Sequence, residues 1–159
     1  MRCLRLVWLL MLILILPPVV VTPAAAPADF SGVWEFNPAK SKNVGMMSNL
    51  RLTSTIKQTD TMLIISEASV FNGQEQKNEV RYDLTGKAVS NERPMSGRNE
   101  TVSKWAGDKL VTTWTGEGAI AGTKVVRTET ISLSADGKTL TVESVRGSNP
   151  PLVMVYDRK

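Results

Sequence analysis

The alternation of apolar and polar residues is the main structural signal in this chain. Leu110, Thr112 and Trp114 share one face of a short run, and Leu140 and Val142 repeat the pattern further on. A period of two residues is typical of strands that bury one face of a sheet. Because no long segment has the period of a helix, the chain is predicted to be all-β.

Turn residues divide the alternating runs into ten expected strands. Turns such as Ala106-Gly107-Asp108 and Ala135-Asp136-Gly137 separate the runs, and Asp and Gly tolerate the positive φ of tight hairpins. Ten hairpin-connected strands must close or form a sandwich, because open sheet edges invite aggregation. We therefore expect an antiparallel up-and-down closed β-barrel of about 8–10 strands. The expected strands are residues 32–37, 50–58, 61–67, 77–83, 87–90, 99–106, 109–116, 123–133, 138–146 and 151–158.

Two stretches interrupt the alternation. Residues 38–49 and 90–98 contain glycine and proline and lack a regular apolar row. Both are predicted to be loops, placed to flank a mouth of the barrel.

The first 28 residues are predicted to be a cleaved signal peptide. Arg2 and Arg5 precede an apolar run, which ends in the small residues of 24–28. The alternative is an uncleaved membrane anchor, but the run is shorter than the roughly 20 residues of a span, and prolines interrupt it. Cleavage after Ala28 would leave residues 29–159 as a single exported domain without a membrane span, in the periplasm or the extracellular space.

Charge and cysteine content narrow the function classes. The chain has a net charge of +4, and loss of Arg2 and Arg5 with the signal peptide lowers it to +2. The basic residues are scattered, which argues against a nucleic-acid partner. Histidine is absent, and the one cysteine, Cys3, lies in the predicted signal peptide. Cys–His and Ser–His–Asp catalysis and zinc sites built on His or Cys are therefore excluded, and no metal or other cofactor is expected.

Both ends of the predicted domain resemble the calycin group, meaning lipocalins, intracellular fatty-acid-binding proteins and their bacterial relatives. Residues 29–34, Asp-Phe-Ser-Gly-Val-Trp, resemble the first lipocalin motif, and residues 155–158, Val-Tyr-Asp-Arg, resemble a last strand. The resemblance implies that Gly32 lets the chain pass tightly into the first strand, that Trp34 plugs the closed end, and that Arg158 lies over Trp34. Small exported bacterial proteins of unassigned function share the opening at 32–41 and the hairpin at 133–142.

The sequence departs from these families at points that bear on the ligand. The second lipocalin motif is absent, and residues 38–49 are too few for the two helices of fatty-acid-binding proteins. In those proteins an Arg-x-Tyr pair in the last strand clamps a carboxylate. Here Tyr156 matches the tyrosine, but Met154 stands in place of the arginine, which argues against a fatty-acid clamp because a buried carboxylate would lack its ion partner.

Three aromatic residues are candidate ligand contacts. Trp105 and Trp114 flank the hairpin around Gly107. They would offer aromatic area to a flat apolar ligand or simply fill the core, and the core reading is favoured. The hydroxyl of Tyr156 would either point into the cavity or be satisfied within the core.

Arg127 is a fourth candidate ligand contact, and whether it can reach a ligand depends on which face of its strand points into the barrel. Arg127 and Glu129 share one face with Val125 and Ile131. On the inside they would form a polar anchor for a ligand, and on the outside a surface ion pair worth about 0–1 kcal/mol. The opposite row of Val and Thr residues also suits an interior. The sequence therefore does not decide which row faces inward, and an outward Arg127 is the expected arrangement.

The function predicted from the sequence is non-catalytic binding of a small apolar or amphipathic molecule inside an exported barrel. One alternative is a structural or protein-interaction module of the cell envelope, with a barrel filled by side chains and a contact loop at 92–97 that includes Arg93 and Met95. An enzyme that uses only carboxylates, Arg or Tyr is a third possibility, and it would need a perturbed acid in a cleft. An outer-membrane barrel is disfavoured because the outer rows carry Lys, Thr and Glu.

Overall fold

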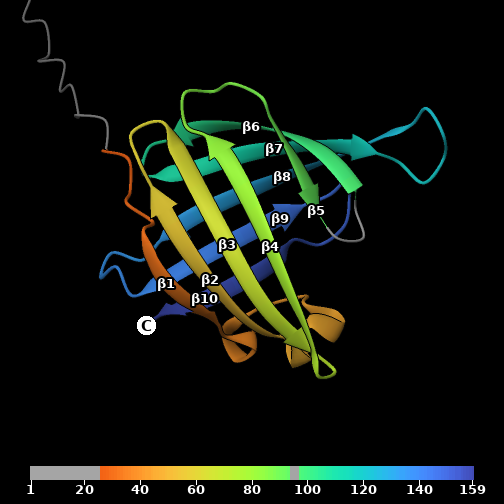
Figure 1. The fold of residues 1–159 in the computed structure, drawn as a ribbon. Coiled ribbons are helices and arrows are strands. Elements are labelled where there is room, and N and C mark those ends of the chain that lie inside the picture. The colour runs from red at the N-terminus through yellow and green to blue at the C-terminus, as the bar shows by residue number, and fades with distance from the viewer. Residues whose placement is uncertain (1–25, 94–96) are drawn as a thin grey trace, which may run out of the picture.

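A computed structural model describes residues 26–93 and 97–159, so nearly all of the predicted signal peptide lies outside the described residues. The ten predicted strands are confirmed, with ends that shift by a few residues, and two short 3₁₀ helices join them (Figure 1). In chain order the elements are β1 (Gly32–Phe36), η1 (Pro38–Lys40), η2 (Gly45–Asn49), β2 (Arg51–Gln58), β3 (Met62–Phe71), β4 (Gln74–Asp83), β5 (Val89–Arg93), β6 (Gly97–Ala106), β7 (Lys109–Glu117), β8 (Lys124–Leu133), β9 (Thr139–Val145) and β10 (Leu152–Arg158).

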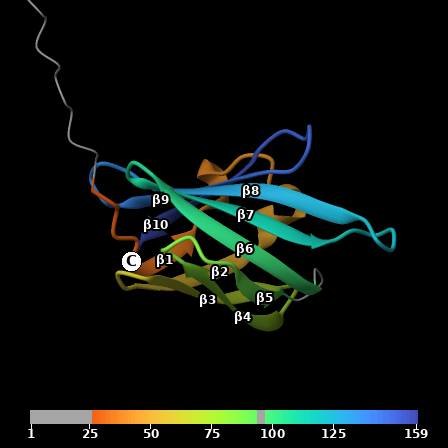
Figure 2. The same cartoon turned by 90° about the horizontal axis from the view of Figure 1, so that it is seen from above.

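The strands form one antiparallel up-and-down sheet that curls into a barrel. Their order is β4-β3-β2-β1-β10-β9-β8-β7-β6-β5, so strands that follow one another in the chain pair, except β4 and β5, and β1 pairs with β10 to join the two halves. Seen from above, β2, β3 and β4 form one layer and β6, β7, β8 and β9 the other (Figure 2). Because β4 and β5 are the two ends of this order, the predicted barrel is nearly closed, with one seam between them.

A side chain bridges the seam where the backbone ladder is missing. Oδ1 of Asn91 in β5 accepts a hydrogen bond from the Arg81 N–H at 2.9 Å, and its Nδ2 donates to the Arg81 carbonyl at 2.9 Å. Nδ2 also lies 3.0 Å from Oγ1 of Thr101 in β6. The buried Asn91 amide thus satisfies the backbone N–H and carbonyl of Arg81, which have no partner strand at the β4–β5 seam.

The two predicted loops have different outcomes. Residues 38–49 form η1 and η2, and the Lys42 N–H and carbonyl bond to Val153 of β10 at 2.9 and 3.0 Å, which ties this segment to the barrel. The loop prediction for 90–98 is wrong at both ends, because β5 runs to Arg93 and β6 starts at Gly97, and residues 94–96 lie outside the described residues. The polar run around Asn91 hid the strand, since its inward residue bonds to backbone instead of packing. Within the described ranges, no helix is both long and apolar enough to cross a membrane.

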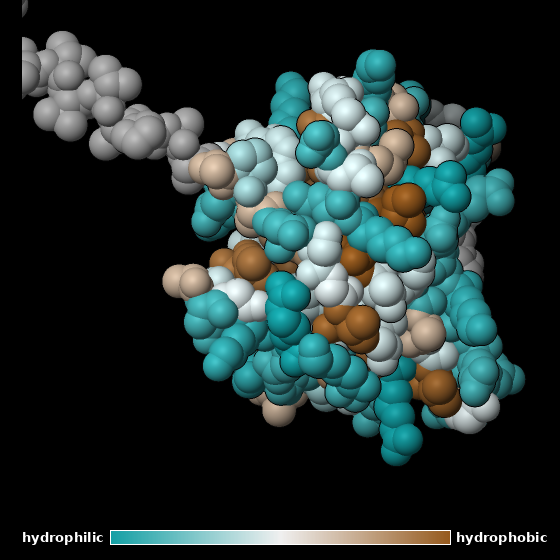
Figure 3. Space-filling model, turned by 60° about the vertical axis from the view of Figure 1, so that its left-hand side comes forward, coloured by the Kyte–Doolittle hydropathy of each residue, from teal (hydrophilic) through white to brown (hydrophobic). Residues whose placement is uncertain are grey.

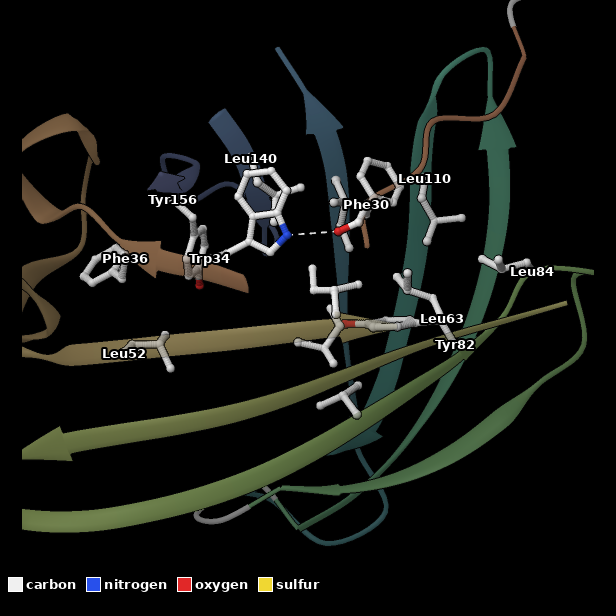
Figure 4. Packing of buried hydrophobic residues seen from close by; sticks show 14 of the residues in the cluster. Phe30, Trp34, Phe36, Leu52, Leu63, Tyr82, Leu84, Leu110, Leu140 and Tyr156 are labelled. Carbon is white, nitrogen blue, oxygen red and sulfur yellow. Dashed lines mark hydrogen bonds between the residues drawn. The ribbon is translucent and has the colours of Figure 1, made fainter. Parts of the chain in front are cut away.

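The core consists of the inward rows of the strands. Large side chains from β1, β2, β3, β4, β7, β9 and β10 point toward one another, as Figure 4 shows. The rows of β6 and β7 add fully buried small polar residues, with Ser103 Oγ 2.9 Å from Thr112 Oγ1. Most of the buried polar side chains therefore lie on β5–β8, next to the apolar Leu110 and Trp114 of β7 and Ile131 of β8. The outer face drawn in Figure 3 is largely hydrophilic, with hydrophobic residues in separate small patches.

Candidate ligand-binding site

A cavity of about 180 Å³ lies within the barrel, bordered by η2 and by inward residues of both layers. Its apolar lining includes Leu52, Ile65, Val142 and Met154. Its polar lining includes Glu67, Tyr82, Glu129 and Tyr156. Wider hollows lie on the outer surface, such as one of about 440 Å³ over β2–β4, but they are open to solvent and so do not remove a ligand from water. The interior cavity is therefore the candidate site.

Tyr156 borders the cavity and is almost fully buried. Its ring lies 5.6 Å from the Phe36 ring, centroid to centroid, at a tilt of 56°. β-sheet register places it beside Leu140 of β9, and its hydroxyl donates to the Met154 sulfur at 3.7 Å. Tyr156 thus combines a packed ring with a polar group at the cavity wall, so the two readings of its sequence position are not exclusive.

Trp114 is a buried hydrogen-bond donor next to the cavity. Its Nε1 donates to Glu129 Oε2 at 2.5 Å, and the Tyr82 hydroxyl donates to the same oxygen at 3.2 Å. The Tyr82 and Trp114 rings meet edge to face, with centroids 5.8 Å apart. Trp114 is 2% exposed, and its role in the structure is to hold the buried Glu129 carboxylate.

Arg127 and Glu129 lie on the inside of the barrel, so the expected outward orientation is wrong. Ile131, on the same face, is 1% exposed and Glu129 is 7% exposed, whereas Val126 on the opposite face is 51% exposed. The Arg127 guanidinium carbon lies 4.4 Å from the Trp114 ring centroid. A cation over an indole face contributes on the order of 0.5–2 kcal/mol, which compensates in part for desolvating the charge.

Trp105 lies away from this cluster. Its ring stacks on Phe30 at 5.8 Å and 11°, and it borders a surface hollow of about 410 Å³ together with Asp29 and Asp60. The pairing register puts Trp105 opposite Leu110, four residues along β7 from Trp114. The structure thus brings Trp114 and Arg127 together and separates Trp105 from both.

The closed end of the barrel has the three residues that the calycin resemblance implied there. Trp34 is fully buried and donates from Nε1 to the Phe30 carbonyl at 2.9 Å (Figure 4). The Arg158 guanidinium carbon lies 4.2 Å from the Trp34 ring centroid, and its nitrogens donate to the carbonyls of Ser31 and Gly137. A Cβ on Gly32 would lie 2.7 Å from Arg158 Nη1, which explains the glycine.

Sequence reasoning missed two contributors to the interior. Tyr82 was recognised only as part of a strand, although its alternation with the buried Val80 and Leu84 was a signal that it faces inward. Asn91 was assigned to a loop, and no local signal shows that its amide bonds across a seam. Of the proposed interaction loop 92–97, residues 94–96 lie outside the described residues, and that alternative stays a prediction.

The carboxylates with shifted pKa values have structural partners. A hydroxyl hydrogen bond from Thr85 and a backbone one from Lys87 lower the pKa of Asp83, and Ser134 and Lys138 lower that of Asp136 in the same way. Hydrogen bonds from Lys40 and Asn37 lower the pKa of Asp157. Each shift stabilises the ionised form within a turn or next to a strand, as expected for structural aspartates. Over the described ranges, no group of three or more His, Cys, Asp or Glu residues is placed to hold a metal ion.

Comparison with known proteins identifies the fold. A scan against protein-family models finds no match, and a search of curated proteins finds none either. Among solved structures, the REP1-NXSQ fatty acid transporter is 14% identical with a TM-score of 0.64, over 82% of this chain and 96% of the transporter. Human cRBP IV is 19% identical with a TM-score of 0.61, over 84% of this chain and 100% of its own.

A third structure, apo lipid binding protein 8 (LBP-8) of Caenorhabditis elegans, gives the same picture. It is 14% identical with a TM-score of 0.64, and the match covers 84% of this chain and all of LBP-8. At these identities the likeness concerns the fold. The predicted all-β, up-and-down barrel of the lipocalin and fatty-acid-binding-protein type is therefore confirmed.

Proposed function

We propose that this protein is an exported, non-catalytic carrier that holds a small amphipathic molecule inside its barrel. The observation that carries the proposal is the interior cavity, whose lining combines apolar side chains with the polar groups of Glu129, Tyr82 and Tyr156. Sites of this kind bury most of a ligand and use a few polar groups to orient it. The printed names of two fold neighbours, a fatty acid transporter and a lipid binding protein, support the same class of function.

The cavity volume limits the size of the ligand. At roughly 30 Å³ for each water-sized group, 180 Å³ holds about six such groups. Burial of about six methylene groups at ~0.8 kcal/mol each gives about 5 kcal/mol, which corresponds to a dissociation constant on the order of 0.1–1 mM before any polar contact. We therefore propose a short-chain ligand, or one whose longer chain leaves the barrel beside η2.

Export is proposed from the basic residues and the apolar segment that precede residue 29. Fractionation of the native host, with N-terminal sequencing of the isolated protein, tests this part. A protein that starts near residue 29 outside the cytoplasm is the expected result, and an intact N-terminus in the cytoplasm contradicts it.

The test of the carrier function is native mass spectrometry of the protein isolated from its own host, followed by organic extraction. A small molecule bound in the cavity is expected. In Val142→Phe, the added ring fills the cavity and the molecule is lost, whereas the same change on the outer face, Val126→Phe, leaves it bound. A bare mass for the native protein, with no tryptophan-fluorescence response to short-chain amphiphiles, would refute the carrier proposal.

A further inference from the structure

The buried Glu129 carboxylate is held at one of its two oxygens. Register places Glu129 between Thr112 of β7 and Ser144 of β9, on the inner row of β8. Two side-chain donors among the described residues, Trp114 Nε1 and the Tyr82 hydroxyl, bond to Glu129, and both bonds end on Oε2. These two donors fix the orientation of the carboxylate, since both come from rings that are themselves buried.

The second oxygen keeps lone pairs for another donor. Oε1 of Glu129 lies 4.0 Å from Arg127 Nη2, which is an ion pair beyond hydrogen-bond distance. Arg127 is held over the Trp114 ring instead, and its Nε has no hydrogen-bond partner among the described residues. An ionised carboxylate has about four acceptor sites, so two donors at Oε2 leave acceptor capacity in a residue that lines the cavity.

A second carboxylate lines the same cavity from the other layer. Glu67 of β3 is half-buried, and its Oε2 accepts from Asn78 Nδ2 at 3.1 Å. Three hydroxyls lie in the lining: that of Tyr82 donates to Glu129, that of Tyr156 donates to Met154, and the third belongs to the buried Ser54. The charged groups of the lining are thus two carboxylates, and the Arg127 cation outside the lining faces only that of Glu129.

We infer that the polar end of the ligand is a cationic hydrogen-bond donor, a primary amine, whose protons reach Oε1 of Glu129. A carboxylate ligand would bring like charge against Glu129 and Glu67, of which only Glu129 has the Arg127 cation beside it, and this disfavours such a ligand. An amine supplies both the missing donor and the opposite charge. This inference rests on the proposed carrier function and adds the head-group class to it.

The experiment compares three six-carbon probes of equal chain length, namely hexylamine, 1-hexanol and hexanoate. Each is titrated at pH 7 into the protein, expressed from its full-length coding sequence and isolated from its host, with binding followed by calorimetry. The expected order of affinity is amine, alcohol, acid, with at least a tenfold difference between amine and acid. Chain burial is the same for all three, so the difference reports the head group.

Variants assign the preference to the residue. Glu129→Gln keeps the shape of the side chain but replaces one carboxylate oxygen by an NH₂ donor. The ratio of the affinities for hexylamine and hexanoate is expected to fall below threefold. Glu143→Gln, an exposed position on the neighbouring strand, is the matched control and is expected to keep the wild-type ratio. Near-UV circular dichroism shows whether each variant folds. If Glu129→Gln does not fold, Glu67→Gln takes its place, and we expect it to lower the affinity ratio two- to fivefold.

The outcomes separate the two proposals. Hexanoate binding as tightly as hexylamine would overturn the amine inference and leave the carrier function standing. A tenfold preference that survives in folded Glu129→Gln would overturn the assignment to Glu129. Binding by none of the three probes, in a protein that also carries no native ligand, would overturn both the inference and the carrier function.

Discussion

Replacing Asn91 by Ala tests whether one side chain closes the barrel. The change removes three hydrogen bonds, two to the backbone of Arg81 and one to Thr101, with donor–acceptor distances of 2.9–3.0 Å. At a net value of about 0.5–1.5 kcal/mol each, their loss costs about 1.5–4.5 kcal/mol. Because Asn91 is 5% exposed, water cannot replace all of these bonds in the closed barrel, and we expect about 3 kcal/mol.

Urea denaturation measures this loss, and hydrogen exchange locates it. With an m-value of about 2 kcal/mol per M, a cost of about 3 kcal/mol lowers the midpoint by about 1.5 M. The Arg81 amide is expected to lose its protection, because its acceptor is gone. Ser90→Ala is the control, since it removes an exposed hydrogen bond to Arg98 from the same strand and should cost less than about 0.5 kcal/mol. A loss in Asn91→Ala no larger than in this control, with Arg81 still protected, would refute the role of the amide.

Further predictions concern the closed end of the barrel and the acid limb of stability. Gly32→Ala places a Cβ 2.7 Å from Arg158 Nη1 at a φ of +140°, and urea unfolding should show a loss of about 1–3 kcal/mol; a loss below about 0.5 kcal/mol would contradict the steric argument. Arg158→Met removes the cation over Trp34 and should cost about 1–2 kcal/mol with a red-shifted tryptophan emission, and an unchanged spectrum would argue against the contact. The lowered pKa of Asp157 stabilises the fold above its unfolded value of about 3.9, and this contribution is lost as pH falls through the folded pKa. Stability should therefore decline below about pH 4, and less steeply in Asp157→Asn; parallel acid-unfolding curves for the two proteins would contradict this.

The sequence by itself was sufficient for the architecture. Alternation with a period of two marks a strand wherever one face is buried, and Asp-Gly or Gly-Asp turns mark its ends, because both features act over a few residues. The resemblance of the Gly32–Trp34 opening and of Arg158 to calycins further predicted that Trp34 plugs one end of the barrel and that Arg158 lies over it. Only β5 escaped recognition over most of its length, since Asn91 takes the place of an apolar residue in its inner row.

The candidate site shows where sequence reasoning ended. In β8, one row holds Val125, Arg127, Glu129 and Ile131, and the other row holds residues that suit a core equally well. Hydrophobicity alone therefore does not decide which row faces inward, and the expected outward orientation of Arg127 is wrong. The phase follows from the neighbours, because Leu110 and Trp114 of β7 pair directly with Ile131 and Arg127 and must share their face.

The sequence therefore determined an all-β chain of ten strands with a defined first and last strand, because strand formation depends on residues that are close along the chain. The tertiary structure alone decided the inward phase of Arg127 and Glu129, the bridge from Asn91 to Arg81 and the volume of the cavity. Each of these depends on which side chains meet across strands separated by many residues. Such meetings are fixed by register and by the packing of the whole interior, which no local pattern encodes.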